Sequence, residues 1–452
     1  MAVKEGSNLT LLEQAIERVQ ALSPRRLLAL PFVRNVGVLT AANFASAALA
    51  FVQGILVARW LGPELYGVAA LVMSMPNLVF TFFDTRSVEA SLKFLSEFHA
   101  RGEGEKALAM CKVGYAVDFT IALLAFLVSI FIAPWAALNI AHRSEATGLI
   151  IIYASAFLPR ALVSTSYAVL ASLGHFSVIA FIGIATTLVR VILVLGMVWL
   201  GWQVAGVVWG NAAAMVLTGL LYSTYAFPLA KRQWGGLWWQ VDWHLLKGRG
   251  REILGFIVYN DLTVLLGMIP KQLDVVLLGY FRNPTEVGYY KLAKSIAGTV
   301  GYLVGPLQSV TYPKFAQLWG TGNQEGLRRT VRRLALSGGA PLGLAALLGI
   351  AFVPFVVPPL VGNAYRPAIV AMQLLLVGSA VWLAFFWLRP LYFAKGMIKT
   401  WTNITVFVVC LSIAGFIVAI PLWGYLGLAI WLMLMHLLGH GIGVIYLRKG
   451  CK

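Results

Sequence analysis

Eight charged side chains fall inside long apolar stretches of the chain, where charge is costly. Six are basic and two are acidic: Arg160, Arg190, Lys271, Lys291, Lys294 and Arg389, with Asp118 and Asp274. Each would cost ~2.5–3.5 kcal/mol if it faced lipid, so we expect these side chains to face protein, one another or a hydrated cavity. A cavity with an excess of bases would select an anionic ligand.

Four of these charges lie on one predicted helical hairpin in the middle of the chain. At a rise of ~1.5 Å per residue, Lys271 and Lys294 lie about 15 Å deep, and Asp274 and Lys291 about 10 Å deep. Their equal depth predicts an ion pair between Asp274 and Lys291, which leaves Lys271 and Lys294 uncompensated. The alternative is a single neutralising cluster that holds the hairpin together, although three bases and one acid do not balance.

Three of the bases are next to a proline. They occur in Pro159-Arg160, Pro270-Lys271 and Arg389-Pro390. Proline removes one helical hydrogen bond, and irregular backbone at membrane depth is tolerated where it is buried in protein or lines a cavity. The coincidence favours a polar chamber, with ordinary bending by proline as the alternative.

The sequence offers little for covalent catalysis or for holding a metal. Its three cysteines are scattered without a CxxC pair, and it contains no G-x4-GK[ST] phosphate loop. We therefore predict no catalytic residues, no metal site and no cofactor.

Twelve predicted membrane-spanning helices would position these charges. The chain of 452 residues is 60% hydrophobic and 12% charged, with a mean hydropathy of +0.82, whereas soluble domains are roughly 25% charged. Apolar runs of about 20 residues can each cross a ~30 Å hydrocarbon core. The predicted spans are 36–58, 64–83, 113–133, 148–171, 176–199, 204–227, 252–281, 284–311, 334–357, 367–394, 400–420 and 425–447. The pattern indicates an all-α polytopic membrane protein.

Lysine and arginine alternate in number from one side of the predicted membrane to the other. Twenty-five of the 35 lie in the termini and in alternate loops, and only four lie on the opposite side: Arg59, Arg143, Arg282 and Arg366. The positive-inside rule therefore predicts that both termini are cytoplasmic. The net charge of +18 arises from these bases on the cytoplasmic side. We therefore predict a protein of the cell membrane that has no nucleic-acid partner.

The first 35 residues precede the spans and lack the apolar core of a secretory signal. Thr10 and Glu13 fit a capping box, and apolar residues follow at helical spacing until Pro24. We predict a cytoplasmic amphipathic helix that lies on the inner leaflet, or that docks a partner.

The second half of the chain is a diverged copy of the first, displaced by 220 to 222 positions. Pro63-Glu-Leu-Tyr-Gly67 returns as Pro284-Thr-Glu-Val-Gly288. Six spans in each half predict two parallel six-helix lobes, 36–227 and 252–447, related by an axis along the membrane normal. Residues 228–251, rich in tryptophan, form the predicted cytoplasmic linker, and 448–452 form a cytoplasmic tail.

The stretches ILVARWLGPELYG (55–67) and DVVLLGYFRNPTEVGYYKLA (274–293) resemble the polysaccharide and oligosaccharide flippases of the multidrug/oligosaccharidyl-lipid/polysaccharide (MOP) superfamily. The resemblance extends from about residue 36 to the end. It implies a V-shaped pair of bundles around a central cavity, and an oligosaccharide substrate on a polyprenyl-pyrophosphate carrier. Polysaccharide synthesis machinery in the membrane is a partner that this substrate would imply.

The family's use of ion gradients implies H⁺ or Na⁺ as a partner, with Asp274 and Asp118 as coupling candidates chosen on residue type and depth. The six bases would hold the pyrophosphate. One alternative is a multidrug or cation antiporter of the same superfamily, although span 36–58 contains no acid. Another is a membrane glycosyltransferase, although Glu64, Glu145 and Glu286 on the outer side are widely separated.

Overall fold

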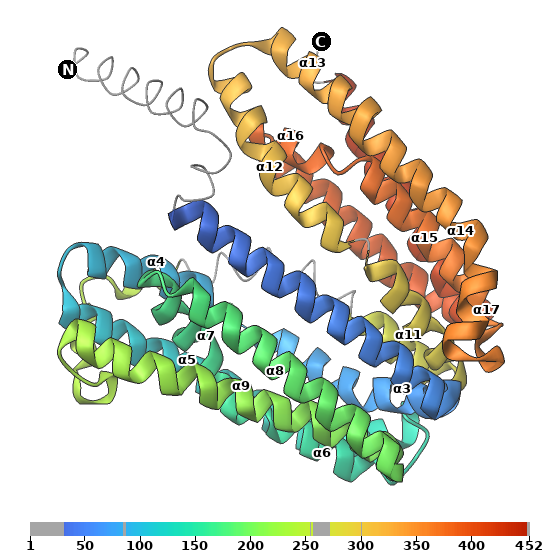
Figure 1. The fold of residues 1–452 in the computed structure, drawn as a ribbon, viewed down its shortest axis with the longest axis horizontal. Coiled ribbons are helices and arrows are strands. Elements are labelled where there is room, and N and C mark those ends of the chain that lie inside the picture. Colours follow the sequence, from blue (N-terminus) through green and yellow to red (C-terminus); the bar gives the residue numbers. More distant parts are fainter. Residues whose placement is uncertain (1–30, 85–86, 254, 256–271, 300, 450–452) are drawn as a thin grey trace.

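The computed structural model describes residues 31–84, 87–253, 255, 272–299 and 301–449. Across these residues the regular structure is helical throughout (Figure 1), and seven segments are long and apolar enough to cross a membrane. The chain is therefore an all-α, multi-pass membrane protein, as predicted. The predicted N-terminal amphipathic helix lies outside the described residues.

The helices before residue 235 form one bundle, the N-lobe. In chain order they are α3 (Pro31–Phe83), α4 (Ser87–Ala100), α5 (Gly104–Asn139), α6 (Ala146–Ser155), α7 (Phe157–Ser172), α8 (Phe176–Met197), η1 (Val198–Trp202) and α9 (Gln203–Trp234). Short turns η2 (Trp238–Gln240) and η3 (Trp243–Leu246) follow in the linker.

The helices after residue 271 form the second bundle, the C-lobe. It begins with the helix Gln272–Phe281. The others are α11 (Pro284–Gly298), α12 (Gly301–Gly320), α13 (Gln324–Leu334), η4 (Ala335–Gly339), α14 (Ala340–Val361), η5 (Asn363–Tyr365), α15 (Ala368–Ala384), α16 (Leu388–Ala394) and α17 (Ile398–Lys449).

Three of the seven apolar segments are too long for one crossing, at 47, 59 and 50 residues. Each is divided by a glycine with positive φ: Gly62 at 73°, Gly201 at 90° and Gly424 at 58°. Glycine adopts this conformation at little steric cost because it has no Cβ, so the chain can reverse within a few residues. The seven segments thus match ten of the twelve predicted spans. The other two, 252–281 and 284–311, include positions outside the described residues.

The two lobes meet where the duplicated Pro-x-x-x-Gly motifs cross, and they diverge toward the ends that carry α4 and α13 (Figure 1). A Cβ on Gly67 would lie 1.8 Å from the carbonyl oxygen of Pro284, and a Cβ on Gly288 would lie 1.9 Å from that of Pro63. The contact is reciprocal, because the glycine of each motif receives the proline of the other. Small residues allow such close approach of membrane helices, and only glycine fits at these two positions.

Hydrogen bonds at the closed end of the V also join the lobes. Three side chains donate to main-chain carbonyls across the boundary: Arg59 to Pro359 (3.2 Å), Tyr365 to Ala58 (3.1 Å) and His142 to Gly279 (2.8 Å). Since a carbonyl only accepts, His142 Nε2 carries the proton in this arrangement. We call these three the closed-end contacts.

At the open end, the linker is fixed to α4 of the N-lobe through Arg249. Its guanidinium donates to both carboxylate oxygens of Glu97, at 2.8 and 3.1 Å, and to Glu252 at 2.8 Å. It also lies over the rings of Phe94 and Phe98, at 5.3 and 5.5 Å from their centroids. The hydrogen bonds from Arg249 hold the pKa of Glu97 and that of Glu252 below the usual 4.5.

Replacing Gly67 or Gly288 by alanine should force the lobes apart at their crossing. We expect each substitution to lower the free energy of unfolding by about 1–3 kcal/mol, the range for overpacking, measured by thermal or SDS unfolding. The double variant should lose less than the sum of the two, because one separation relieves both clashes. Gly54→Ala is the control, since a Cβ there meets nothing within 4 Å; equal losses in all three variants would contradict the argument.

The hydrogen bonds from Arg249 to Glu97 and Glu252 should make the protein less stable at acidic pH. A carboxylate whose pKa is lowered by folding stabilises fully above its unfolded pKa, and this contribution is lost as pH falls through the folded value. The melting temperature of the wild type should therefore exceed that of Glu97→Gln/Glu252→Gln by a constant amount at neutral pH. The difference should shrink below about pH 4.5. Glu325→Gln, which breaks an exposed ion pair with Arg329 on α13, should change little at any pH.

Candidate functional site

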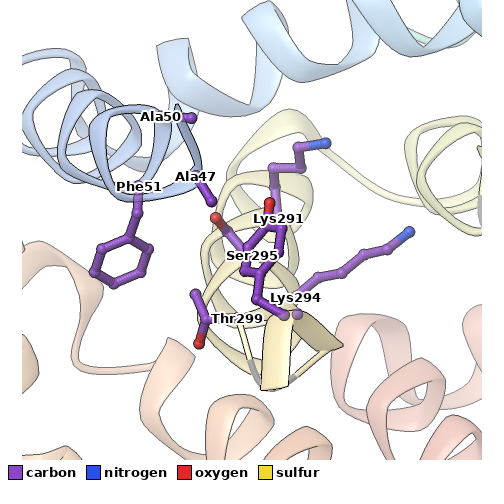
Figure 2. A pocket seen from close by; sticks show the side chains of 9 residues that line it. Ala47, Ala50, Phe51, Lys291, Lys294, Ser295 and Thr299 are labelled. Atoms are coloured by element: carbon purple, nitrogen blue, oxygen red, sulfur yellow. The ribbon is translucent and has the colours of Figure 1, made fainter. Parts of the chain in front are cut away.

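A cavity of about 310 Å³ lies between the two lobes (Figure 2). One wall is α3, where the small side chains of Ala47 and Ala50 stand beside Phe51. The other is α11, from which Lys291 and Lys294 extend. The remaining lining residues are Ser295, Gly298, Thr299 and Tyr302. The small residues of α3 leave space between the lobes, and the lysines make that space positive.

The sequence before the cavity lysines fixes where α11 begins. Asn283 caps the helix by accepting from the backbone N–H of Glu286 at 3.0 Å, and Pro284 occupies the first turn, where its fixed φ suits a helix. Lys291 and Ser295 are four residues apart, so they lie on the same face of α11, and both line the cavity. Packing of α11 on α3 and α15 sets which face this is.

Asp274 lies behind the cavity and is 2% exposed. Its carboxylate accepts from Lys294 Nζ at 2.6 Å and from the hydroxyl of Tyr290 at 2.5 Å. Its other oxygen accepts from the backbone N–H of Val275 at 2.7 Å. A buried charge held by one cation and two further donors is well compensated.

The predicted ion pair between Asp274 and Lys291 is wrong, because Asp274 pairs with Lys294. Depth alone placed Asp274 and Lys291 at one level, but helical phase decides which side chain reaches the acid. Tyr290 and Lys294 are four residues apart and share the face of α11 that meets the helix Gln272–Phe281. Lys291 is rotated by roughly 100° from Tyr290 and lines the cavity instead. Lys271 lies outside the described residues.

Lys291 gives the cavity its net positive charge. Its side chain is half-buried, and among the described carboxylates none lies within ion-pair distance of its ammonium. Lys294 is 31% exposed on the cavity side and shares its charge with Asp274. Two ammonium groups therefore act against one carboxylate, so an anion that enters meets an attractive potential.

The N-lobe bases Arg160 and Arg190 lie on α7 and α8. Arg160 stacks over Phe80, with its guanidinium carbon 4.9 Å from the ring centroid. Arg190 lines a separate hollow between α8 and α9. The structure thus gives Arg190 a setting apart from the cavity lysines.

Two of the three predicted irregularities beside a proline fall within the described residues. The helix is interrupted at Ala156, before Pro159, so that α6 ends and α7 begins there. It is interrupted again between Ala384 and Leu388, before Pro390. At the first break, Gly219 on α9 packs against the Pro159 carbonyl, where a Cβ would lie 2.0 Å from the oxygen. A neighbouring helix therefore covers this break.

Arg389 does not line the interlobe cavity. Its side chain is exposed and lies over its own neighbour Phe393, 5.1 Å from the ring centroid, on α16. Helix α16 packs on α12 and α17. Arg389 is thus not grouped with the two lysines of this cavity, which sequence spacing alone could not indicate.

Asp118 lies in the N-lobe rather than beside the cavity lysines. It is 7% exposed and accepts from the Ser87 hydroxyl, from the Thr165 hydroxyl at 2.8 Å and from the Thr165 backbone N–H at 3.3 Å. Among the described bases none forms an ion pair with it. Asp118 joins α4, α5 and α7 through hydroxyl groups, so the two candidate coupling acids have different surroundings.

Sequence reasoning missed the polar residues that accompany the lysines. Ser295, Thr299 and Tyr302 follow Lys291 at intervals of four, eight and eleven, which is the spacing of one helix face. This polar stripe could have been found by applying helical phase to the predicted span. In the portions of the chain that the structure describes, no three His, Cys, Asp or Glu side chains are grouped as metal ligands.

Residues 32–319 match the family model described as polysaccharide biosynthesis protein. No curated protein sequence is significantly similar to the chain.

Several solved structures share the fold. An inward-facing multidrug resistance MATE family transporter of the MOP superfamily superposes with a TM-score of 0.71 at 15% identity, over 89% of this chain and 95% of that one. The lipid II flippase MurJ in an inward closed conformation gives 0.70 at 13% identity, over 91% and 87%. An outward-facing MATE family transporter gives 0.58 at 16% identity, over 92% and 94%.

Double-mutant cycles should locate the partner of Asp274. We expect Asp274→Asn and Lys294→Gln to be coupled by about 1 kcal/mol in the free energy of unfolding, near the low end of contacting pairs because Lys294 is partly solvated. Asp274→Asn and Lys291→Gln should be coupled by less than about 0.5 kcal/mol. SDS unfolding of the purified protein measures both cycles, and stronger coupling to Lys291 would restore the pairing that depth alone suggests.

Proposed function

Because the chain belongs to the polysaccharide biosynthesis protein family of the MOP superfamily, we propose that it is a lipid-linked oligosaccharide flippase. Its substrate is an oligosaccharide or polysaccharide unit on a polyprenyl-pyrophosphate carrier, moved across the cytoplasmic membrane by alternating access. The observation that carries this proposal is the interlobe cavity, which is lined by Lys291 and Lys294 of α11 and by Ala47, Ala50 and Phe51 of α3.

The chemistry of the cavity suits a pyrophosphate diester, which is dianionic. Lys291 offers an ammonium group with three donors and no described carboxylate partner. Lys294 offers a second ammonium, and Ser295 a hydroxyl beside it. The dianion would compete with Asp274 for Lys294, so substrate binding would weaken the ion pair between Lys294 and Asp274.

The direction of transport follows from the charge bias of the loops. With both termini cytoplasmic, the open end of the V faces the cytoplasm, where polysaccharide synthesis machinery would deliver the substrate. Export then requires the lobes to separate at the closed end. The closed-end contacts must break, and the crossing of Gly67 and Gly288 must open.

An ion gradient would drive this cycle through Asp274 rather than through Asp118. Asp274 contacts a cavity lysine directly, so its protonation would release Lys294 to the substrate. Asp118 is held by hydroxyl and backbone donors within the N-lobe. A proton is the simplest coupling ion for Asp274, because Tyr290 and Lys294 already occupy one of its oxygens.

The alternatives fit the cavity less well. A multidrug or cation antiporter would expose a cationic ligand to two lysines and a single buried acid. A membrane glycosyltransferase needs acids near the reacting groups, and the described lining of this cavity includes none. The solved structures with this fold are transporters and a flippase.

Removing the charge of Lys291 should impair transport more than folding. In proteoliposomes that contain a fluorescent short-chain polyprenyl-pyrophosphate sugar, we expect Lys291→Gln to slow translocation at least about tenfold, since tenfold corresponds to 1.4 kcal/mol. Lys291→Arg should retain part of the activity because it keeps the charge. Lys399→Gln removes an equal charge from an exposed position outside the cavity and should transport normally.

Two outcomes would count against the proposal. Near-normal translocation by Lys291→Gln would remove the cavity from the substrate path. Transport of cationic dyes by the wild type, without transport of the lipid-linked sugar, would instead support the antiporter.

A further inference from the structure

A second, smaller hollow of about 110 Å³ lies in the N-lobe between α8 and α9. Its lining is mostly polar: Thr186, Thr187, Arg190, Asn211, Ala214, Met215 and Thr218. Three threonines, an asparagine and an arginine on neighbouring membrane helices are an expensive set to bury without a ligand or water.

The hollow faces away from the lipid. On α8 the exposed apolar residues Phe181, Ile184, Leu188 and Ile192 recur at helical spacing and mark the lipid side. Arg190 follows Leu188 by two residues, which places it roughly 200° around the helix. Helix α8 also packs on α3, the helix that forms one wall of the interlobe cavity.

The hydrogen-bonding groups of the hollow are unevenly divided between donors and acceptors. Thr186 and Thr218 donate their hydroxyl protons to the carbonyls of Ile182 (2.8 Å) and Ala214 (2.6 Å) on their own helices. Asn211 donates one amide proton to the carbonyl of Val207 at 2.8 Å. These side chains therefore present mainly oxygen lone pairs to the hollow.

Arg190 supplies the main donors. Its Nε is buried and has no hydrogen-bond partner among the described residues. A guanidinium has five N–H donors and no acceptor, so Arg190 complements the three oxygen-bearing neighbours. The hollow thus offers donors and acceptors side by side.

This mixture of donors and acceptors suits the sugar of a lipid-linked oligosaccharide better than it suits the pyrophosphate. A pyrophosphate has only acceptors at neutral pH, so it could bond to Arg190 but not to the hydroxyl groups of Thr186 and Thr218, whose protons are already donated. A sugar hydroxyl both donates and accepts, so it can bond to the oxygens and to Arg190 at once. The lysine cavity has the opposite character, because its ammonium groups only donate.

We propose that the Arg190 hollow binds a sugar residue of the substrate head group, while Lys291 and Lys294 hold the pyrophosphate. This inference rests on the proposed flippase function and divides its binding site between the lobes. Helix α3 links the two subsites: it forms one wall of the lysine cavity and packs on α8, which carries Arg190. At ~30 Å³ per water, the volume of about 110 Å³ corresponds to about four waters, so the hollow has room for part of a sugar ring.

The test compares ligands with and without sugar on the full-length protein in nanodiscs. Affinity is measured for farnesyl pyrophosphate and for a panel of farnesyl-pyrophosphoryl sugars carrying glucose, galactose or N-acetylglucosamine. We expect at least one sugar-bearing ligand to bind the wild type more tightly than farnesyl pyrophosphate. Asn211→Leu and the near-isosteric Thr218→Val should each weaken that ligand about five- to tenfold, the loss of one to two hydrogen bonds.

The control variants separate this inference from the function on which it rests. Farnesyl pyrophosphate should bind both hollow variants within about twofold of the wild type, whereas Lys291→Gln should weaken every ligand. Thr120→Val is the matched control, since Thr120 also donates to a carbonyl four residues earlier but is exposed on α5; it should change nothing.

The sugar subsite and the flippase function fail on different results. If Asn211→Leu and Thr218→Val weaken farnesyl pyrophosphate as much as the sugar ligands, or weaken neither, the sugar subsite is refuted while the flippase proposal stands. The subsite is likewise refuted if no sugar on the panel improves affinity. If the wild type fails to bind farnesyl pyrophosphate, or if Lys291→Gln binds it normally, the proposed function itself fails.

Discussion

The reciprocal crossing of Gly67 and Gly288 with Pro284 and Pro63 is the constraint on which the rest of this structure depends. Main chain meets main chain there, so the separation of the lobes is fixed by backbone atoms rather than by adaptable side chains. On α11, Gly288 lies one helical turn before Lys291. The crossing therefore sets how far the cavity lysine stands from the opposing wall of α3, and the same contact closes one end of the V.

Much of the fold follows from hydropathy, charge bias and internal repetition, because each is a property of whole segments. The glycine turns at Gly62, Gly201 and Gly424 even match the predicted boundaries. The site depended on finer information. Depth along a helix is readable from residue number, but the partner of Asp274 was decided by helical phase, and Arg389 lies on a short helix that follows an irregular turn. Such turns depend on how neighbouring helices pack, which one sequence does not reveal.

The two copies of the repeat differ where the chemistry lies. At an offset of 221, Asp274 and Lys291 correspond to Gln53 and Ala70. Gln53 is buried, and its side-chain oxygen lacks a hydrogen-bond partner in the described part of the chain. The N-lobe thus keeps a polar group at the position of the acid but lacks a cation to meet it. Its own membrane-embedded bases, Arg160 and Arg190, lie on α7 and α8, so the lobes share a backbone plan and contribute different binding groups.

The closed-end contacts have a consequence for how such a chain can change over evolutionary time. Arg59, Tyr365 and His142 all donate to carbonyl oxygens, and every amino acid supplies one of these. Mutations at the accepting positions therefore leave the acceptor in place as long as the backbone path persists. The accepting half of the closed-end contacts is thus insensitive to amino-acid substitution, and homologous proteins can keep these hydrogen bonds while their sequences diverge widely.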